Sequence, residues 1–422
     1  MSSIPWIIVV GAGPAGLLLS LLLSQAGIPV QVLEKSTSLD EQPRATHYGP
    51  PAVYELRRSG VLDAIRERGF HPNVVCWRKL DGTFLAGLDH RVQEDDPDRM
   101  ICLPLNQLGQ ILYERLVQQP NVTICWDHRV IAIGQDENNA WVDVDTPSGT
   151  KRFSAPYIVG CDGANSQIRR SLFGDSEFPG KTWDQQIVAT NVYYDFHKFG
   201  YDDANFIIDP THWYMASRIS TDGLWRVTYG EKVATREELL ARQPAKWQEM
   251  IPGHPTPEQY KIVNFSPYRV HQRLAHAMRV GRFLLSADAA HLCNPFGGLG
   301  LTGGIVDVGG LSDCLVGIYH GKADDSILDI YSQVRRQKYS EVIDPISSSN
   351  IRLMFDSDPG TVMETNEFLK LAKRSETDKV FAKEMMSAIN VIKYDFTQHY
   401  QNASADGTNG QVTPIAVAGV TD

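Results

Sequence analysis

The sequence of 422 residues contains no C-x-x-C pair, and its six cysteines form no cluster with histidine at zinc-ligand spacing. This excludes the common zinc sites and favours buried, reduced thiols, as in a cytosolic protein. Positive charge is also scarce, because 40 Lys and Arg residues oppose 50 Asp and Glu residues, for a formal net charge of −10. Such an acidic chain argues against nucleic acid or an anionic membrane surface as the main partner.

Long apolar runs are missing as well. The apolar stretch 4–23 is interrupted by Gly11, Gly13, Pro14 and Gly16, so it cannot form one membrane-spanning helix. No other uninterrupted run approaches the roughly 20 residues that a span requires. We therefore expect no membrane span. With 42 % apolar residues, the length instead predicts two to three structural units with sizeable cores.

The chain begins with a β–α–β pattern. Residues 7–10 are a short β-branched run typical of a buried parallel strand, and an apolar helix (17–26) and a second strand (29–34) follow. Further on, the patterns predict helices at 49–70, 105–118 and 305–320, antiparallel strands at 122–126, 130–133 and 140–146, and buried strands at 157–161 and 282–286.

The middle of the chain has a different character. Between residues 182 and 265 aromatic residues become dense and short strand-like runs recur, which predicts a separate antiparallel sheet with a helical insert near 236–247. Beyond residue 327 the pattern is helical and more charged. Residues 401–422 are small and polar, and we expect a mobile tail there.

Gly11, Gly13 and Gly16 form a G-x-G-x-x-G motif between the first strand and the first helix. The first glycine permits a tight turn, the second lets the backbone approach a pyrophosphate, and the third allows close helix packing. The helix N-terminus adds free N–H groups and a positive dipole end. Glu34 ends the second strand, where a carboxylate can accept hydrogen bonds from an adenosine ribose. These residues predict a dinucleotide site, since a glycine turn made only for packing leaves Glu34 unexplained.

Two further motifs follow predicted strands. Residues 160–166 (GCDGANS) close one strand, and alone they are equally typical of a simple Asp-Gly turn. In the segment 282–301 a strand ends at Asp288, after which Pro295 and a run of glycines open a helix. An aspartate there can hold ribityl hydroxyls, and the helix amides can face the pyrimidine edge of a flavin, where negative charge grows on reduction.

In order and spacing, these three motifs resemble the single-component (group A) FAD-dependent aromatic hydroxylases, a flavoprotein monooxygenase family that includes para-hydroxybenzoate and phenol hydroxylases. The resemblance covers roughly residues 5–345. It implies an α/β fold with a Rossmann-like, GR2-type FAD-binding domain, an inserted antiparallel-sheet substrate domain and a C-terminal helical region. The implied boundaries are 1–75, 106–178 and 273–345 for the FAD-binding domain, 76–105 and 179–272 for the substrate domain, and 346–400 for the helical region.

The resemblance also implies which residues bind FAD. The family pattern places the pyrophosphate, the riboses, the adenine, the ribityl chain and the isoalloxazine against Gly11, Gly13, Pro14, Ala15, Gly16, Glu34, Lys35, Arg44, Gln107, Val130, Asp162, Asp288, Pro295, Gly298, Gly300 and Leu301. Asp162 is expected to serve both FAD and NAD(P)H. Two positions depart from the pattern: Ala287 stands where the family has Gly, and Thr302, followed by Gly303, stands where it has Asn and Thr.

The implied chemistry is a two-stage cycle. NADPH or NADH reduces the FAD, molecular oxygen adds to give a flavin C4a-hydroperoxide, and its terminal oxygen passes to an electron-rich ring carbon. The expected substrate is a phenol or an aromatic polyketide, in catabolism or secondary metabolism. The alternatives are an FAD-dependent epoxidase, an oxidase or dehydrogenase acting on a non-aromatic compound, and a non-catalytic FAD sensor. The W-x-W-x-I-P motif of halogenases is absent.

The middle segment should supply the substrate pocket. Strand alternation puts Arg226 and Tyr229 on opposite faces, and His212 on the same face as Tyr214. A buried Arg or a His–Tyr pair can hold a phenolate, although aromatic-rich sheets are more often core. The catalytic candidates are His47, His212, Tyr214, Arg226, Tyr229 and Pro295. No metal is expected, and residues near 347–354 either cap the active site or make a homodimer contact.

Overall fold

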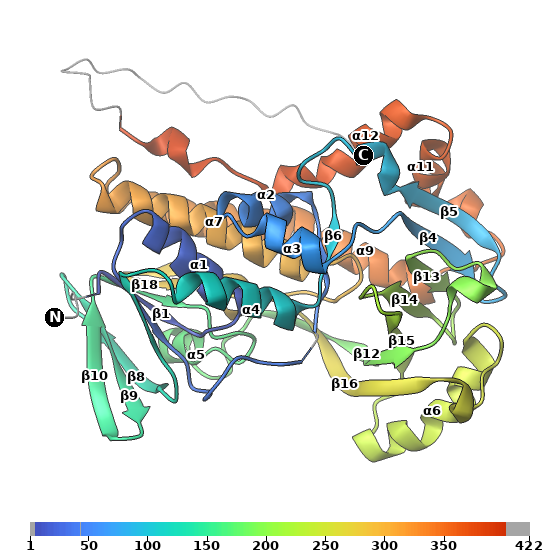
Figure 1. The fold of residues 1–422 in the computed structure, drawn as a ribbon, viewed down its shortest axis with the longest axis horizontal. Helices are drawn as coiled ribbons and strands as arrows, with labels where there is room; N and C mark the ends of the chain where they lie inside the picture. Colours follow the sequence, from blue (N-terminus) through green and yellow to red (C-terminus); the bar gives the residue numbers. More distant parts are fainter. Residues whose placement is uncertain (1–4, 43, 402–422) are drawn as a thin grey trace.

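The computed structural model describes residues 5–42 and 44–401, which form two lobes side by side (Figure 1). One lobe is built on a six-stranded sheet of order β17-β18-β11-β1-β2-β7. Its strands are β1 (Ile7–Val10), β2 (Val30–Leu33), β7 (Val122–Cys125), β11 (Tyr157–Gly160), β17 (Arg279–Val280) and β18 (Phe283–Leu285). All pairs are parallel except β17 with β18. The mixed α/β architecture expected from the sequence is confirmed.

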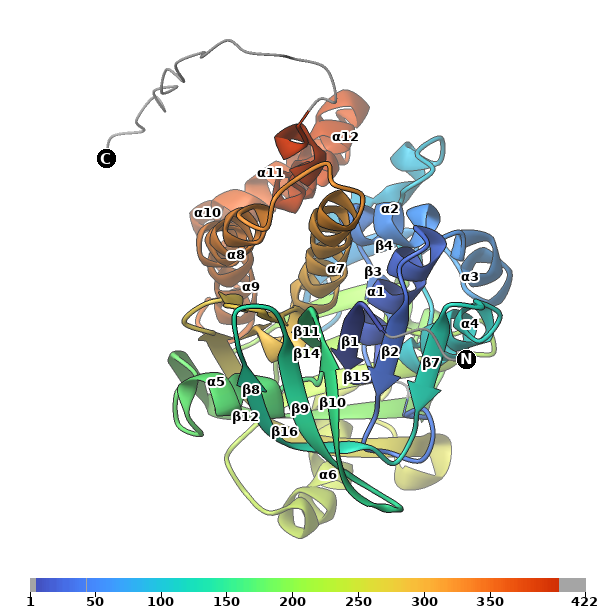
Figure 2. The same ribbon diagram turned by 90° about the vertical axis from the view of Figure 1, so that its left-hand side faces the viewer.

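The six-stranded sheet is covered on both faces, which explains the uniformly apolar β1 and β11. Helices α1 (Pro14–Gln25), α4 (Leu105–Leu116) and α7 (Leu299–Tyr319) pack together on one side. The other side carries a three-stranded sheet of β8 (Arg129–Gln135), β9 (Ala140–Thr146) and β10 (Gly149–Ala155), as Figure 2 shows.

Two expectations about this lobe are wrong in detail. Residues 122–126 do not belong to an antiparallel sheet, because β7 pairs in parallel with β2. As an edge strand β7 is only partly covered, and its alternating pattern reflects that exposure. The segment 49–70 forms two helices, α2 (Pro50–Arg58) and α3 (Leu62–Arg68), because Gly60 (φ +74°) ends the first of them.

The second lobe is an eight-stranded sheet of order β19-β16-β12-β15-β14-β13-β4-β5. Its strands are β4 (Val74–Lys79), β5 (Phe84–Asp89), β12 (Gly180–Tyr193), β13 (Ala204–Ile208), β14 (Tyr214–Arg218), β15 (Leu224–Glu231), β16 (Lys261–Leu274) and β19 (His291–Leu292). Helix α6 (Arg236–Met250) covers one face and buries Trp247 there. On the opposite face, Ile187 and Val270 pack with Phe296 of the other lobe.

Helices complete the molecule. After α7 the chain continues through α8 (Ile327–Lys338), α9 (Asp344–Phe355), α10 (Val362–Thr365), α11 (Glu367–Ser375) and α12 (Lys379–Ser387). Helix α5 (Gln167–Phe173) follows β11. Strands β3 (His47–Tyr48) and β6 (Ile101–Cys102) form a separate two-stranded sheet. By length and composition α7 is apolar enough to cross a membrane, but 78 % of its most apolar window is buried inside the protein. Of the expected tail, only residue 401 lies within the described residues.

Candidate active site

The glycine-rich turn between β1 and α1 has the geometry of a pyrophosphate cradle. A Cβ atom on Gly11 (φ +108°) would lie 2.5 Å from the carbonyl oxygen of Cys161, and one on Gly16 would lie 2.0 Å from that of Gly11. At Gly13, in contrast, a Cβ atom would meet nothing within 4 Å. Gly11 and Gly16 therefore have no room for a side chain, whereas Gly13 faces open space beside the free N–H groups of α1.

Glu34 is half-buried at the end of β2 and is tied to this turn. Its Oε2 accepts a hydrogen bond from the Ala12 N–H at 2.8 Å, and its Oε1 accepts one from the Ser36 N–H at 2.8 Å. The neighbouring Lys35 is exposed, and the exposed Arg44 pairs with Asp40 at 2.9 Å. These contacts place a carboxylate next to the cradle, as the sequence predicted.

Other predicted cofactor residues surround the carboxyl end of the parallel sheet. Gln107 is half-buried in the first turn of α4, where the side-chain oxygen of Asn106 is buried without a hydrogen-bond partner among the described residues. Val130 is buried on β8. Asp162 accepts hydrogen bonds through Oδ2 from the Gln167 and Ile168 N–H groups at the start of α5, while its Oδ1 is buried without such a partner. Burial raises the pKa of Asp162.

Asp288 lies in a short 3-10 turn directly after β18. Its side chain is exposed to solvent, although the surrounding protein raises its pKa by desolvation. The preceding Ala287 has φ +55°, a left-handed conformation that costs a non-glycine residue about 1–2 kcal/mol. A Cβ atom on Gly304 of α7 would lie 2.8 Å from the Ala287 Cβ, so glycine there makes room for the alanine. This accounts for the departure at Ala287.

The loop into α7 presents backbone donors. Gly297 (φ +119°) and Gly298 (φ +67°) follow Pro295, and Gly298 is the N-cap of the helix. The N–H groups of residues 299–301 have no carbonyl four residues earlier within the helix, so they point outward from its N-terminus. The hydroxyl of Thr302 accepts a hydrogen bond from the Gly49 N–H at 3.2 Å, which fastens the loop before α2 to α7. This hydrogen bond gives a structural role to Thr302, the second residue that departs from the family pattern.

Together these features fit FAD, because a glycine cradle, a strand-end carboxylate, a solvent-accessible aspartate and a second helix N-terminus occupy one edge of the sheet. The comparisons agree: the family model described as "FAD binding domain" matches residues 6–345. The chain belongs to the FAD-dependent aromatic hydroxylases, of the kind related to phenol hydroxylase. It is a flavoprotein monooxygenase.

Two relatives and one solved structure are similar to this hydroxylase over most of its length. It is 38 % identical to para-nitrophenol 4-monooxygenase of Pseudomonas sp. (strain WBC-3), over 88 % of this chain and 93 % of the relative. It is 36 % identical to 6-hydroxy-3-succinoylpyridine 3-monooxygenase of Pseudomonas putida (strain DSM 28022 / S16), over 84 % and 90 %. The crystal structure of p-nitrophenol 4-monooxygenase from Pseudomonas putida DLL-E4 superposes with a TM-score of 0.87 at 36 % identity, covering 93 % of this chain and 99 % of that one.

The face of the eight-stranded sheet that meets the other lobe carries a polar cluster. Arg226 on β15 lies directly opposite Asn191 on β12, and its Nε donates to the Asn191 side-chain oxygen at 3.0 Å. The guanidinium of Arg226 also donates to the carbonyl oxygen of Arg44. Burial lowers the pKa of Arg226 to about 10, so it remains charged at neutral pH.

Tyr268 and His47 complete this cluster. Tyr268 of β16 is 40 % exposed, yet desolvation raises the pKa of its hydroxyl to about 12, with Arg226 opposing the shift. His47 of β3 has its carbonyl oxygen 3.6 Å from where a Cβ on Gly298 would stand, so it lies beside the α7 loop. Its Nδ1 is 2.9 Å from the Thr46 hydroxyl, and its Nε2 is buried without a hydrogen-bond partner among the described residues.

The imidazole of His47 is neutral near pH 7. Burial, aided by the positive charge of Arg226, lowers its pKa to about 4. The Thr46 hydroxyl can donate to Nδ1 or accept from it, so Nε2 can present either a proton or a lone pair. A neutral imidazole with one buried nitrogen therefore lies near a half-buried guanidinium.

Three of the predicted catalytic residues lie elsewhere. Tyr214 and Tyr229 are fully buried in the cluster beneath α6, and the Tyr214 hydroxyl is 2.8 Å from that of Tyr201. His212 precedes β14 in a turn, and its Nε2 is 3.7 Å from Glu249 of α6. That these aromatic residues line the pocket stays a prediction. Strand alternation separates two faces without saying which of them α6 covers, and Tyr214 and Tyr229 lie on the covered face.

The sequence reasoning missed Asn191 and Tyr268. Both follow from alternation once Arg226 is taken as the reference: Asn191 is its cross-strand partner, and Tyr268 is opposite Ile187, four residues before Asn191 on β12. Within the described residues, no group of three or more His, Cys, Asp or Glu side chains is arranged to hold a metal ion.

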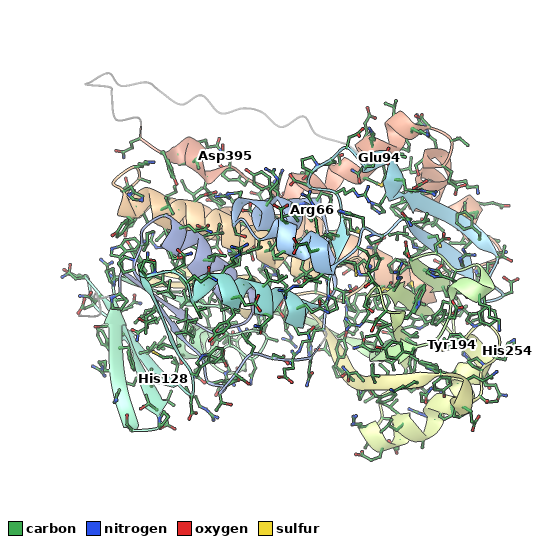
Figure 3. The ribbon with its side chains drawn as sticks, in the orientation of Figure 1. Arg66, Glu94, His128, Tyr194, His254 and Asp395 are labelled. Atoms are coloured by element: carbon green, nitrogen blue, oxygen red, sulfur yellow. The ribbon has the colours of Figure 1, made fainter. Side chains whose placement is uncertain are left out.

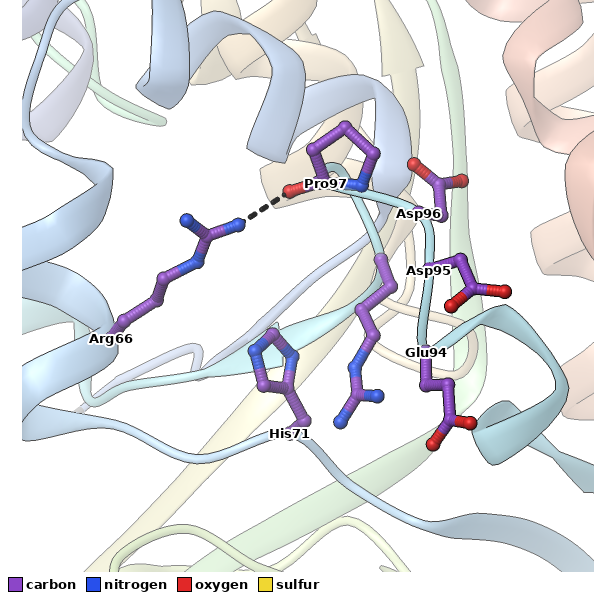
Figure 4. A pocket seen from close by; sticks show the side chains of 7 residues that line it. Arg66, His71, Glu94, Asp95, Asp96 and Pro97 are labelled. Atoms are coloured by element: carbon purple, nitrogen blue, oxygen red, sulfur yellow. Dashed lines mark hydrogen bonds between the residues drawn. The ribbon is translucent and has the colours of Figure 1, made fainter.

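Two surface hollows lie apart from these residues. One, of about 300 Å³, is lined by residues of both charges; Figure 4 shows Arg66, which donates to the Pro97 carbonyl at 2.8 Å, across from Glu94, Asp95 and Asp96. The other, of about 550 Å³, is in the lobe of the eight-stranded sheet and includes Tyr194, labelled in Figure 3. Neither contains any of the predicted catalytic or cofactor residues.

Proposed function

We propose that this enzyme inserts oxygen into a phenol or hydroxypyridine at the ring carbon opposite the hydroxyl group. The names of the two relatives support this regiochemistry. Position 4 of para-nitrophenol is opposite the hydroxyl, and position 3 of a 6-hydroxypyridine is likewise opposite its 6-hydroxyl. Both relatives match most of this chain at 36 % identity or more, which makes a shared ring orientation the simplest proposal.

The observation that carries this proposal is the half-buried pair of Arg226 and His47 beside the α7 loop. A guanidinium that remains charged favours the phenolate form of the substrate, in which electron density at the opposite ring carbon is highest. In our proposal Arg226 holds the phenolate oxygen, and Asn191 fixes the guanidinium through its 3.0 Å hydrogen bond. His47, neutral at pH 7, takes the phenol proton or donates to the phenolate through Nε2.

The flavin supplies the oxygen-activating chemistry, with NADPH or NADH as the proposed reductant and molecular oxygen as the second substrate. We propose that the cradle residues predicted from the sequence bind FAD: Gly11, Gly13, Pro14, Ala15, Gly16, Glu34, Lys35, Arg44, Gln107, Val130, Asp162, Asp288, Pro295, Gly298, Gly300 and Leu301. The α7 loop would then bring the flavin ring against the ring of the substrate. Phe296 and Trp213, with ring centroids 5.4 Å apart, would exclude water from this junction.

We also propose the domain division drawn from the sequence: an FAD-binding domain (1–75, 106–178 and 273–345), a substrate domain (76–105 and 179–272) and a helical region (346–400). The assignment of β4 and β5 to the same sheet as β12–β16 supports it. All six cysteines are free, which favours the cytoplasm as the location. A homodimer remains a proposal from the sequence.

Positional isomers test the proposed regiochemistry. The purified enzyme is assayed for NAD(P)H oxidation with 2-, 3- and 4-nitrophenol and with other 4-substituted phenols. We expect 4-nitrophenol to stimulate oxidation most strongly: oxygen joins the carbon opposite the hydroxyl, the nitro group leaves as nitrite, and the ring product is 1,4-benzoquinone. Among the other 4-substituted phenols, only those whose substituent can leave as an anion, such as a halide, should give a 1,4-dioxygenated ring. Equal stimulation by all isomers, or oxygen inserted next to the hydroxyl, would contradict the proposal.

Substitution of the anchor tests the binding role. Arg226→Met removes a charge-assisted hydrogen bond of about 1.5–3 kcal/mol, so kcat/KM for a 4-substituted phenol should fall roughly 10- to 100-fold. Tyr229→Phe, on the opposite face of the same strand, is the matched control and should change kcat/KM less than about twofold. If the two variants behave alike, Arg226 does not hold the substrate.

A further inference from the structure

A buried carboxylate lies directly beside the turn that carries Asp288. Asp307 of α7 is completely buried, and its Oδ2 accepts hydrogen bonds from the Ala287 N–H at 3.2 Å and from Nε2 of His291 at 2.6 Å. Its Oδ1 accepts a hydrogen bond from Nε of Arg335 at 2.6 Å. This single carboxylate therefore connects the end of β18, strand β19, α7 and α8.

The network extends to the 3-10 helix Ala388–Ile392, which follows α12. Arg335 is itself buried and donates a second hydrogen bond, from Nη1 to the carbonyl oxygen of Ile392, at 2.6 Å. Burial works to raise the pKa of Asp307, but His291 and Arg335 outweigh it and hold the pKa below its ordinary value. An ionised carboxylate accepts stronger hydrogen bonds than a neutral group, so the Ala287 N–H has a firm anchor.

Ala287 needs such an anchor. Its left-handed backbone is unfavourable for a residue with a Cβ atom, and that Cβ is confined by Gly304, where a further Cβ would come within 2.8 Å. Helix α7 thus holds Ala287 in two ways: its Cβ packs against Gly304, and its N–H donates to the carboxylate of Asp307. Relaxation of Ala287 to an ordinary backbone angle would redirect the next residue, Asp288.

We propose that Asp307 is a positioning residue for FAD: by anchoring the left-handed Ala287 it directs the Asp288 side chain toward the ribityl chain of the cofactor. The anchor is required because this chain has alanine at a turn suited to glycine. This inference depends on FAD binding and not on the identity of the aromatic substrate, so it can be tested separately from the proposed regiochemistry.

A double-mutant cycle tests the inference. The dissociation constant for FAD is measured by titrating apoprotein of the wild type, Asp307→Asn, Ala287→Gly and the double variant. Asparagine is uncharged and has one acceptor oxygen where aspartate has two, so it cannot accept from Ala287, His291 and Arg335 at once; Asp307→Asn should therefore raise the dissociation constant at least about tenfold. In the Ala287→Gly background the same change should raise it less than about threefold, because glycine adopts the turn without an anchor.

Asp313→Asn is the matched control. Asp313 lies on the same helix and pairs with Arg58, away from the Ala287 turn, so its substitution should change FAD affinity less than about twofold. An unchanged dissociation constant in Asp307→Asn would overturn the proposal. Equal factors in the two backgrounds would do so as well, since they would show that Asp307 acts through charge or general stability.

Hydrogen exchange of the unmodified apoprotein provides a check that needs no variant. The Ala287 amide, bonded to a buried carboxylate, should exchange at least about 100-fold more slowly than amides in the exposed turn 221–223. Exchange of the Ala287 amide as fast as that of the exposed turn would show that the anchor is not formed in solution, and the proposal would fail.

Discussion

Glu55 of α2 is a buried carboxyl group packed against the backbone of α7. A Cβ atom on Gly309 would lie 2.1 Å from the carboxyl carbon of Glu55, so only glycine leaves room for it. Burial raises the pKa of Glu55 to about 7, although the ion pair with Arg58 at 2.8 Å works against the shift. Because this pKa lies near neutrality, Glu55 makes the stability of the fold depend on pH.

The sign of that dependence follows from linkage. A folded-state pKa above the ordinary 4.5 means that the bound proton stabilises the fold fully below pH 4.5 and that this stabilisation is lost as the pH rises through about 7. The free energy of unfolding should fall by up to about 3 kcal/mol between pH 4.5 and 8 because of this residue. Urea unfolding of the wild type and of Glu55→Gln at several pH values measures it. A difference between the two proteins that stays constant with pH would contradict this account.

At the residue scale, the sequence predicted the residues whose identity is dictated by backbone geometry. Gly11 and Gly16 stand where a Cβ atom has no room, Gly13 faces open space beside the start of α1, and Glu34 follows the end of its strand. Asp307 could not be found this way, because an aspartate in an apolar helix shows its role only when the packed structure brings His291 and Arg335 to it.

At the scale of elements, α7 determines how closely the rest of the molecule can approach. Other parts of the chain fill the space where a side chain on its glycines would stand: Ala287 at Gly304, Glu55 at Gly309 and Phe396 at Gly310. A glycine-rich helix is poor in intrinsic helix propensity, so its stability comes from packing. The glycines of α7 are therefore explained by its close contacts with segments that are distant in sequence.

Gly304→Ala tests that packing. The new Cβ would lie 2.8 Å from the Ala287 Cβ, so α7 and the Asp288 turn must move apart, at a cost of about 1–3 kcal/mol that exceeds the roughly 1 kcal/mol gained from helix propensity. We expect a lower Tm and weaker FAD binding. Gly109→Ala, in α4 where a Cβ meets nothing within 4 Å, is the control and should raise the Tm slightly. A Tm for Gly304→Ala at or above that of the wild type would show that the contact is not tight.

The elements also show why part of the site escaped prediction. Alternation correctly separated Arg226 from Tyr229, since a strand has only two faces. Which face meets the flavin depends on where α6 packs, and α6 comes from a segment whose position over the sheet is set by long-range contacts of Trp247. Aromatic density therefore indicated the core under α6, whereas the polar cluster lies on the other face.

At the scale of the whole molecule, two lobes meet where the α7 loop approaches the cluster of Arg226 and His47. The proposed cradle for FAD is made by one lobe and the proposed substrate anchor by the other, a common arrangement for binding sites between domains. The resemblance read from three motifs was sufficient for the family and the cofactor, both of which are confirmed. In our proposal, substrate choice depends on side chains gathered from β3, β12, β15 and β16, which no local motif describes.

We propose that this junction transfers one atom of molecular oxygen to a ring carbon opposite a hydroxyl. The most direct test is turnover of a 4-substituted phenol with NAD(P)H under ¹⁸O₂, followed by mass spectrometry of the product. With 4-nitrophenol we expect one ¹⁸O atom in the ring product, at the carbon that carried the nitro group, and one equivalent of released nitrite, formed only when FAD and the phenol are both present. Oxidation of the reductant with no ¹⁸O in the product, or ¹⁸O at another ring position, would contradict it.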